Sequence, residues 1–238
     1  MAGKRFSKSA TSARIVAVAS GKGGTGKTFL TSALGYSLAT RHARRVTLLD
    51  LDFQGSLTRF LGAKAAAAPF DDPPVEAHGM SLFRGGLALK EADDGDVIAQ
   101  ISRAAGNGET LVIDMRPDLL DVAHRVCLER PDVFWVIVPR LLLESVSEAQ
   151  KLIGLISAHG QRFLIVGNEH YRARAVSRAN ALLANGYREH LLDAAIPRQS
   201  VVPEAAGERQ PLTRYAPKSA AAAVVDRLAD TLVAESAA

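Results

Sequence analysis

The chain has 238 residues, of which 47% are hydrophobic and 23% charged, so it is long enough to bury a sizeable core. Its apolar fraction excludes a disordered or collagen-like chain, and its single cysteine, Cys127, excludes a disulfide scaffold. The formal net charge of +4 fits polyanionic partners without establishing them. No apolar run reaches the roughly 18 to 20 residues of a membrane span, and the start lacks the apolar stretch of a secretion signal, so we expect a cytoplasmic protein.

Residues 1–13 are basic and polar and predict a flexible basic arm, for which a frayed terminus is the simpler interpretation. From Arg14 onward, short β-branched apolar runs alternate with helical stretches, which predicts one domain over 14–238. The expected strands are 14–20, 45–50, 110–115, 133–139 and 162–168, and the expected helices include 27–40 and 145–158. Near-continuous apolar strands separated by helices predict an α/β fold, in which helices cover both faces of a mostly parallel twisted sheet.

The pattern weakens between residues 62 and 106. There we expect loops, one short strand and a helix over about 91–105, with no chemical role. Near the end of the chain, at about 218–236, apolar residues recur at helical spacing, which predicts a packing helix. Cys127 lies on an apolar stretch and is expected to be a buried small hydrophobe.

A glycine-rich segment joins the first predicted strand to the first predicted helix. It matches the pattern G-x-x-x-x-G-K-[ST] and reads Ser20-Gly21-Lys22-Gly23-Gly24-Thr25-Gly26-Lys27-Thr28. In such a loop, backbone N–H groups and the helix N-terminus face phosphates, Lys27 reaches the β- and γ-phosphates, and the Thr28 hydroxyl ligates Mg²⁺. The residues expected to bind the nucleotide are Gly23, Gly24, Thr25, Gly26, Lys27, Thr28 and Phe29. A glycine-rich turn without a ligand would hardly need the lysine and the threonine.

A second lysine, Lys22, directly follows the first glycine of the loop. With it, the segment resembles the deviant Walker A motif, KGGxxGKT, of the ParA/MinD family of P-loop ATPases. The resemblance implies ATP and Mg²⁺ as cofactors. It also implies a homodimer formed with ATP, in which Lys22 crosses to the phosphates of the partner. Outside this motif, Lys22 would be interpreted as an exposed loop lysine.

Acidic residues end two further predicted strands. The segment Asp50-Leu51-Asp52-Phe53-Gln54-Gly55-Ser56 resembles the family's DxDPQG segment, with Phe53 in place of proline. The apolar run that ends in Asp114 reads as Walker B. The resemblance implies that Asp52 positions the attacking water and that Asp50 and Asp114 hold the metal with Thr28. A helix-capping role would explain one of the first two acids, but not both.

Phe53 and Arg116 depart from the family pattern. Arg116 stands in the turn after Asp114, where the family has a Thr-Pro-Pro-like sequence and senses the γ-phosphate. We therefore expect a chain that binds ATP well and hydrolyses it poorly.

The C-terminal third is similar to the ParA stretch IPRxxxxxEAxxxGxPxxxYxPxS, beginning at Ile196 and ending at Ser219. The resemblance thus covers about 14–236 and is weakest over 62–106. It implies that Asn168 and Pro197 border the adenine, although a simple turn residue explains Asn168 equally well.

The absence of certain sequence features excludes several branches of the family. One cysteine excludes the iron proteins with two cluster cysteines and the targeting ATPases with a zinc-binding pair. The acidic C-terminal end disfavours a MinD-like lipid-binding helix, and about thirteen N-terminal residues are too few for a helix-turn-helix. ParA-type binding to duplex DNA without sequence preference remains. The basic candidates for it are Arg172, Arg174, Arg178, Arg188, Arg198, Arg214 and Lys218, for each of which a solvated arginine face is the alternative.

The sequence therefore indicates a small ParA-type ATPase, monomeric without ATP and dimeric with it, associated with the nucleoid and without membrane insertion. A ParB-like or cargo-adaptor protein would stimulate slow hydrolysis, and the cargo would be a plasmid, a chromosome or a large protein assembly. A regulatory or assembly factor without DNA binding, of the flagellar-number or cellulose-synthesis type, is the first alternative. ATP-dependent amidation or carboxylation is the second, and no second substrate site supports it.

Overall fold

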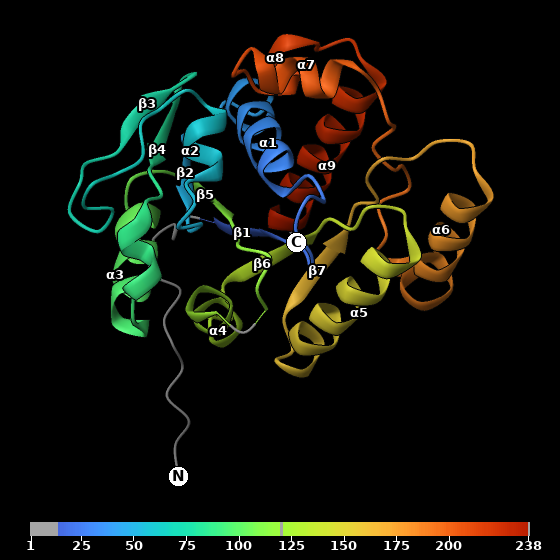
Figure 1. Ribbon diagram of the computed structural model, residues 1–238, viewed down its shortest axis with the longest axis horizontal. Coiled ribbons are helices and arrows are strands. Elements are labelled where there is room, and N and C mark those ends of the chain that lie inside the picture. The colour runs from blue at the N-terminus through green and yellow to red at the C-terminus, as the bar shows by residue number, and fades with distance from the viewer. Residues whose placement is uncertain (1–13, 120, 238) are drawn as a thin grey trace.

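A seven-stranded sheet forms the centre of the computed structural model, which describes residues 14–119 and 121–237 (Figure 1). The expected arm, 1–13, lies outside these residues. The strand order is β3-β4-β2-β5-β1-β6-β7, and all neighbours are parallel except β3 and β4. The strands are β1 (Arg14–Ala19), β2 (Val46–Asp50), β3 (Val75–Ala77), β4 (Met80–Phe83), β5 (Thr110–Asp114), β6 (Val133–Ile137) and β7 (Arg162–Ile165).

Helices cover both faces of this sheet, which confirms the expected α/β class. They are α1 (Lys27–Arg41), α2 (Ser56–Phe60), α3 (Asp94–Ala105), α4 (Val122–Glu129), α5 (Leu143–Ala158), α6 (Arg174–Tyr187), α7 (Val201–Gly207), α8 (Leu212–Tyr215) and α9 (Ala220–Ala237), with 3₁₀ turns η1 (Leu87–Glu91) and η2 (Arg188–His190). Alternate residues of each strand point to opposite faces. Ile15 and Ala17 of β1 pack with α3 to α6, and Val16 and Val18 pack with α1, α2 and α7 to α9.

The segment 62–106 holds two short strands where one was expected. The strand β3 folds back on β4 through His78 and Gly79, whose φ angles of 53° and 81° suit the tight turn of a hairpin. The helix α3 begins at Asp94, three residues after its predicted start, because Asp93 caps it. The Asp93 carboxylate accepts a hydrogen bond from the Asp96 amide at 2.9 Å, and Asp96 accepts one from the Asp93 amide at 3.2 Å.

The other predicted elements are present with shifted ends. The strands β5, β6 and β7 end before the predicted residues 115, 139 and 168, because the last residues of those apolar runs enter the loops at the carboxyl edge of the sheet. The predicted packing helix is α9, and its buried side chains, such as Val225 and Leu228, pack against α1. Within 14–119 and 121–237, no helix is both long and apolar enough to cross a bilayer.

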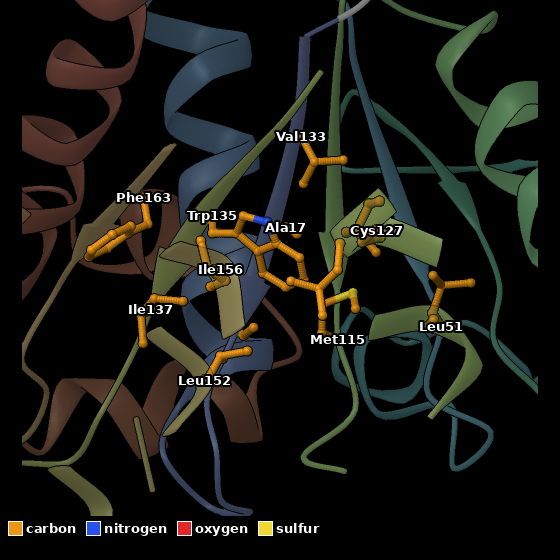
Figure 2. Packing of buried hydrophobic residues seen from close by; sticks show 14 of the residues in the cluster. Ala17, Leu51, Met115, Cys127, Val133, Trp135, Ile137, Leu152, Ile156 and Phe163 are labelled. Atoms are coloured by element: carbon orange, nitrogen blue, oxygen red, sulfur yellow. The ribbon is translucent and has the colours of Figure 1, made fainter. Parts of the chain in front are cut away.

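Trp135, the only tryptophan of the chain, lies at the centre of the core between the sheet and helices α4 and α5 (Figure 2). Its indole N–H donates to the side-chain oxygen of Gln161, whose amide nitrogen donates in turn to carbonyl groups at the end of α4. The ring of His124, in α4, stacks on the indole with 5.9 Å between centroids. The buried polar groups of this cluster thus tie α4 to the core.

Cys127 lies in the same cluster and is fully buried, as expected (Figure 2). Burial raises the pKa of its thiol to about 12, so the group stays protonated at pH 8 and no solvent reaches it.

We expect a thiol reagent at pH 8 to label Cys127 only in molecules that unfold. Labelling should accelerate with urea in step with the loss of helical circular dichroism. Rapid labelling in native buffer would contradict this packing.

Candidate functional site

The glycine-rich loop lies between β1 and α1, at the carboxyl edge of the sheet. Gly24 and Gly26 have φ angles of 70° and 95°, in the left-handed region that favours glycine. A Cβ at Gly26 would also collide with the amide nitrogen of Asn168. The backbone thus requires glycine at these positions, and Gly26 directly precedes the first turn of α1, where unpaired N–H groups favour an anion.

Gly26→Ala is expected to destabilise the nucleotide-free protein by about 1–3 kcal/mol, because it adds both a strained φ and a steric clash. For a chain of this size, each kcal/mol lowers the unfolding midpoint by about 2–4 °C. Gly23→Ala is the matched control, since a Cβ there meets nothing within 4 Å. Thermal unfolding monitored by circular dichroism checks the pair, and equal midpoints for both variants would contradict the argument.

The side chains of the loop are organised around Ser20, which lies outside the G-x-x-x-x-G-K-[ST] pattern. Its hydroxyl donates to the Lys22 carbonyl at 2.7 Å and accepts from Thr25 Oγ1 at 2.8 Å and Lys27 Nζ at 3.2 Å. Lys27 is only 7% exposed. Burial lowers the pKa of Lys27, and attraction by Asp114 and Asp52 opposes this shift. The loop therefore holds a buried ammonium group at its centre.

Two of the predicted acids meet because β5 lies between β1 and β2. Asp50 ends β2 directly opposite Asp114, which ends β5. Thr28 Oγ1 donates to Asp114 at 2.7 Å, and Asp50 accepts from the amide and hydroxyl of Thr58 at 2.8 and 2.7 Å. Burial raises the pKa of Asp114 to about 8, with repulsion by Asp50 adding to it, and burial raises the pKa of Asp50 to about 6. A divalent cation close to them would favour their ionised forms.

The third acid, Asp52, lies at the wall of the cavity in front of the loop. Its two carboxylate oxygens accept from the Gln54 amide at 2.9 Å and from Ser56 Oγ at 2.7 Å. The cavity has a volume of about 470 Å³. Its walls are the loop residues from Gly23 to Phe29 together with Asp52, Ser56, Phe60, Met115 and Pro117.

The segment 62–106 also contributes to the site, against expectation. The amide of Gly85 donates to Thr58 Oγ1 at 2.9 Å, which orients the hydroxyl that binds Asp50. A Cβ at Gly85 would lie 2.6 Å from the Asp52 carbonyl oxygen and 2.8 Å from the Asp50 carboxyl carbon. Neither Thr58 nor Gly85 belongs to a recognisable sequence motif. The sequence therefore gives no sign that these two residues hold Asp50 in place.

A second cavity, of about 710 Å³, continues from the first and shares Gly24, Gly26 and Phe29 with it. It is lined by both residues expected to border a base, Asn168 and Pro197. The bridge between His170 and Pro197 brings the two segments together, and Asn168 is buried with its amide donating to the Thr25 carbonyl at 2.7 Å. Asn168 is therefore more than a turn residue, because it ties the second cavity to the loop.

Lys22 lines neither of the two cavities. Its ammonium pairs with the carboxylate of Glu144, at the start of α5, and lowers the pKa of that carboxyl. The two side chains are 44% and 76% exposed, so the pair lies at the surface beside the loop. The structure thus separates the two lysines of the motif: Lys27 is buried inside the loop and Lys22 is accessible outside it.

The basic candidates are all exposed, but Arg214 lies apart from those around α6. Arg172, Arg174 and Arg178 lie in and before α6, which follows the edge strand β7, and Arg198 joins them by stacking on Tyr171 at 5.6 Å. Arg214 instead contacts His78 in the β3–β4 turn, with 2.7 Å between its Nη1 and the His78 Nδ1. Lys218 follows α8 and lies close to the segment of Arg198, because the Ala221 amide donates to the side-chain oxygen of Gln199 at 2.9 Å. Of these candidates, Arg214 is the one whose side chain is held at the β3–β4 turn.

Fold and site together define a nucleotide-binding protein of the phosphate-loop class. Residues 16–212 match the family described as "CbiA: CobQ/CobB/MinD/ParA nucleotide binding domain", and the chain belongs to this family. It is 34% identical over 164 residues to "Maintenance of carboxysome distribution protein A" of Gloeobacter kilaueensis, covering 59% of this chain and 70% of that protein. It is 25% identical to a "ParA family protein" of Chlamydia trachomatis, covering 92% and 97% of the two chains.

Among solved structures, the fold is similar to that of the septum site-determining protein MinD of Pyrococcus horikoshii complexed with Mg-ADP. The TM-score is 0.76 at 22% identity, and the match covers 92% of this chain and 96% of that one. The Mg-ADP in that structure is consistent with the adenine nucleotide and the metal expected from the sequence. The family predicted from the glycine-rich loop is confirmed.

Proposed function

We propose that this chain is a ParA-type ATPase that binds ATP and Mg²⁺, dimerises around the nucleotide, binds duplex DNA without sequence preference and positions a cargo. The observation that carries the proposal is the loop itself, with one lysine buried at its centre and another accessible beside it. The family membership and the similarity to a carboxysome-distribution protein support it.

The residues of the site fit such a ligand from end to end. The loop N–H groups, Lys27 and the N-terminus of α1 would bind the phosphates, and Thr28, Asp50 and Asp114 would hold Mg²⁺ and its water shell. A metal held there would supply charge neutralisation on the transferred phosphoryl group. Asp52 would orient the attacking water at the wall of the first cavity. The second cavity, bordered by Asn168 and Pro197, would take the base.

The dimer interface would lie around Lys22. An exposed ammonium on the rim of a phosphate site can reach the phosphates of a second molecule, which the buried Lys27 cannot do. ATP would then act as part of the interface, and its hydrolysis would release the two protomers. We propose that a ParB-like or cargo-adaptor protein accelerates this step.

The DNA surface would be the group around α6. Arg172, Arg174 and Arg178 are exposed and close in the chain, and Arg198 adds a fourth guanidinium through its stack on Tyr171. Arginines bind phosphates without reading the bases, so affinity without sequence preference follows. Arg214 is held at the β3–β4 turn and is left out of this surface, whereas Lys218, whose segment lies beside that of Arg198, is kept in it. Binding of DNA would place the protein on the nucleoid.

We expect binding to a DNA duplex with Mg-ATP and not with Mg-ADP or without nucleotide, and it should weaken steeply with salt. Each phosphate contact that is lost lowers the log–log salt slope by about 0.9. The double variant Arg174→Glu with Arg178→Glu should abolish binding. The control, Lys64→Glu with Lys90→Glu, changes the charge equally at exposed positions in the segment 62–106 and should bind as the wild type does. Fluorescence anisotropy at two salt concentrations measures the DNA affinity in each nucleotide state and for each variant.

If the protein forms an ATP-bound dimer that does not bind DNA, DNA binding is not part of its function. The chain would then act through protein contacts, as a regulatory or assembly factor. Equal losses in the α6 variant and in the control would show that net charge matters and that the surface around α6 does not.

A further inference from the structure

Phe53 and Arg116, the two departures from the family pattern, lie in contact. The guanidinium carbon of Arg116 lies 4.4 Å from the centroid of the Phe53 ring. Phe53 belongs to the loop after β2, and Arg116 belongs to the loop after β5. Such a cation–π contact is favourable, and partial burial strengthens it. The Arg116 side chain is 21% exposed.

The Arg116 side chain points away from the phosphate cavity. Its neighbours Met115 and Pro117 line that cavity, whereas Arg116 lines a small cavity of about 20 Å³ between the sheet, α3 and α4. On this side its Nε lies 3.4 Å from the carboxylate of Asp121, which caps α4. Arg116 is thus placed to hold protein segments together and not to touch a nucleotide.

Both sequence neighbours of Asp52, Leu51 and Phe53, contact the loop after β5. On the strand side, the Leu51 amide donates to the Asp114 carbonyl at 3.2 Å. On the other side, Phe53 contacts Arg116. The hydrogen bonds of the Asp52 carboxylate itself are made within its own loop, to Gln54 and Ser56, and do not fix that loop to β5. The contacts made by Leu51 and Phe53, together with the Asp52 amide, which donates to the Asp50 carboxylate at 3.1 Å, therefore help to fix the position of Asp52 relative to Thr28 and Asp114.

We propose that Phe53 and Arg116 act as a pair of positioning residues that fasten the loops after β2 and β5 to each other and so hold Asp52 in place for ATP hydrolysis. This inference rests on the proposed ATPase activity. A misplacement of about 1 Å at a reacting group can cost about 10²-fold in rate, whereas phosphate binding by Lys27 and the loop does not involve the pair.

Phe53→Leu removes the aromatic face and keeps an apolar side chain, and Arg116→Gln removes the cation. Each should lower kcat for ATP at least tenfold and change the affinity for ATP less than threefold. The matched controls Phe53→Tyr and Arg116→Lys retain the cation–π pair and should retain most of the rate. The double variant Phe53→Leu with Arg116→Gln should be no slower than either single variant, because the contact is lost only once.

Single-turnover hydrolysis measures the rate, and equilibrium ATP binding measures the affinity. Amide hydrogen exchange over 51–55 and 115–121 measures how firmly the two loops are held. Faster exchange in both segments in either single variant supports the fastening, even in a chain that does not hydrolyse ATP. A wild type that binds ATP without hydrolysing it under any condition would overturn the ATPase proposal and the positioning role with it. A hydrolysing wild type whose two single variants show independent, additive losses, or unchanged exchange, would overturn the pair alone.

Discussion

Replacing Lys27 with alanine is expected to reduce ATP affinity at least 100-fold, which corresponds to about 2.7 kcal/mol of binding free energy. The ammonium group is buried at the centre of the loop and lines the phosphate cavity. It lacks an ion-pair partner at hydrogen-bond distance among the described residues and is held by the Ser20 hydroxyl and the Lys22 carbonyl. Phosphate oxygens would therefore meet a partly desolvated cation, which strengthens the attraction.

The same experiment includes Lys22→Ala as its matched control. That side chain lies outside the cavities, so ATP affinity should stay within threefold of the wild type, while ATP-dependent dimerisation should disappear. Titration of a fluorescent ATP analogue and light scattering with and without Mg-ATP measure the two properties. A Lys22→Ala protein that still dimerises with ATP would exclude a role for this lysine across the dimer.

Removal of the Asp52 carboxylate is expected to lower the rate of ATP hydrolysis by about 10²- to 10⁴-fold and to leave ATP binding intact. The carboxylate is fixed at the cavity wall by Gln54 and Ser56 and stands apart from the loop that would bind the phosphates. Asp52→Ala should therefore accumulate as an ATP-bound dimer, because the step that separates the protomers is blocked. Single-turnover hydrolysis and the lifetime of the dimer after dilution report the two effects.

A second substitution separates the charge of Asp52 from its structural role. Asp52→Asn keeps an oxygen for the Gln54 amide and preserves the size of the side chain, but it removes the negative charge. We expect it to be nearly as slow as Asp52→Ala. If Asp52→Asn hydrolyses ATP at the wild-type rate, Asp52 is a structural residue of its loop and the water is positioned elsewhere.

Local patterns were sufficient to predict the elements around the site. The apolar runs before Gly21, Asp50 and Asp114 are buried on both faces of a parallel sheet, so their composition alone marks them as strands of such a sheet. Parallel strands place their carboxyl ends at one edge, which is why two acids separated by 64 positions in the chain lie opposite each other. Motif and topology therefore predict the same site.

Contacts between distant segments could not be predicted in this way. The pairing of Lys22 with Glu144, the support of Asp50 by Thr58 and Gly85, and the contact between Phe53 and Arg116 depend on how loops pack in three dimensions. These residues carry no periodicity and no capping signal. The hairpin at His78 was missed for a related reason, because a left-handed φ at a histidine is uncommon.

The stack of His124 on Trp135 gives the chain an optical property of its own. All indole emission comes from one ring, since the sequence has a single tryptophan. That ring touches an imidazole whose Nδ1 lies 2.9 Å from the Asp121 carboxylate, and Asp121 in turn faces Arg116. Indole fluorescence is sensitive to the position and charge of a stacked imidazole. The intrinsic emission of the unlabelled protein should therefore follow movements at the start of α4 in real time, during nucleotide binding and during turnover.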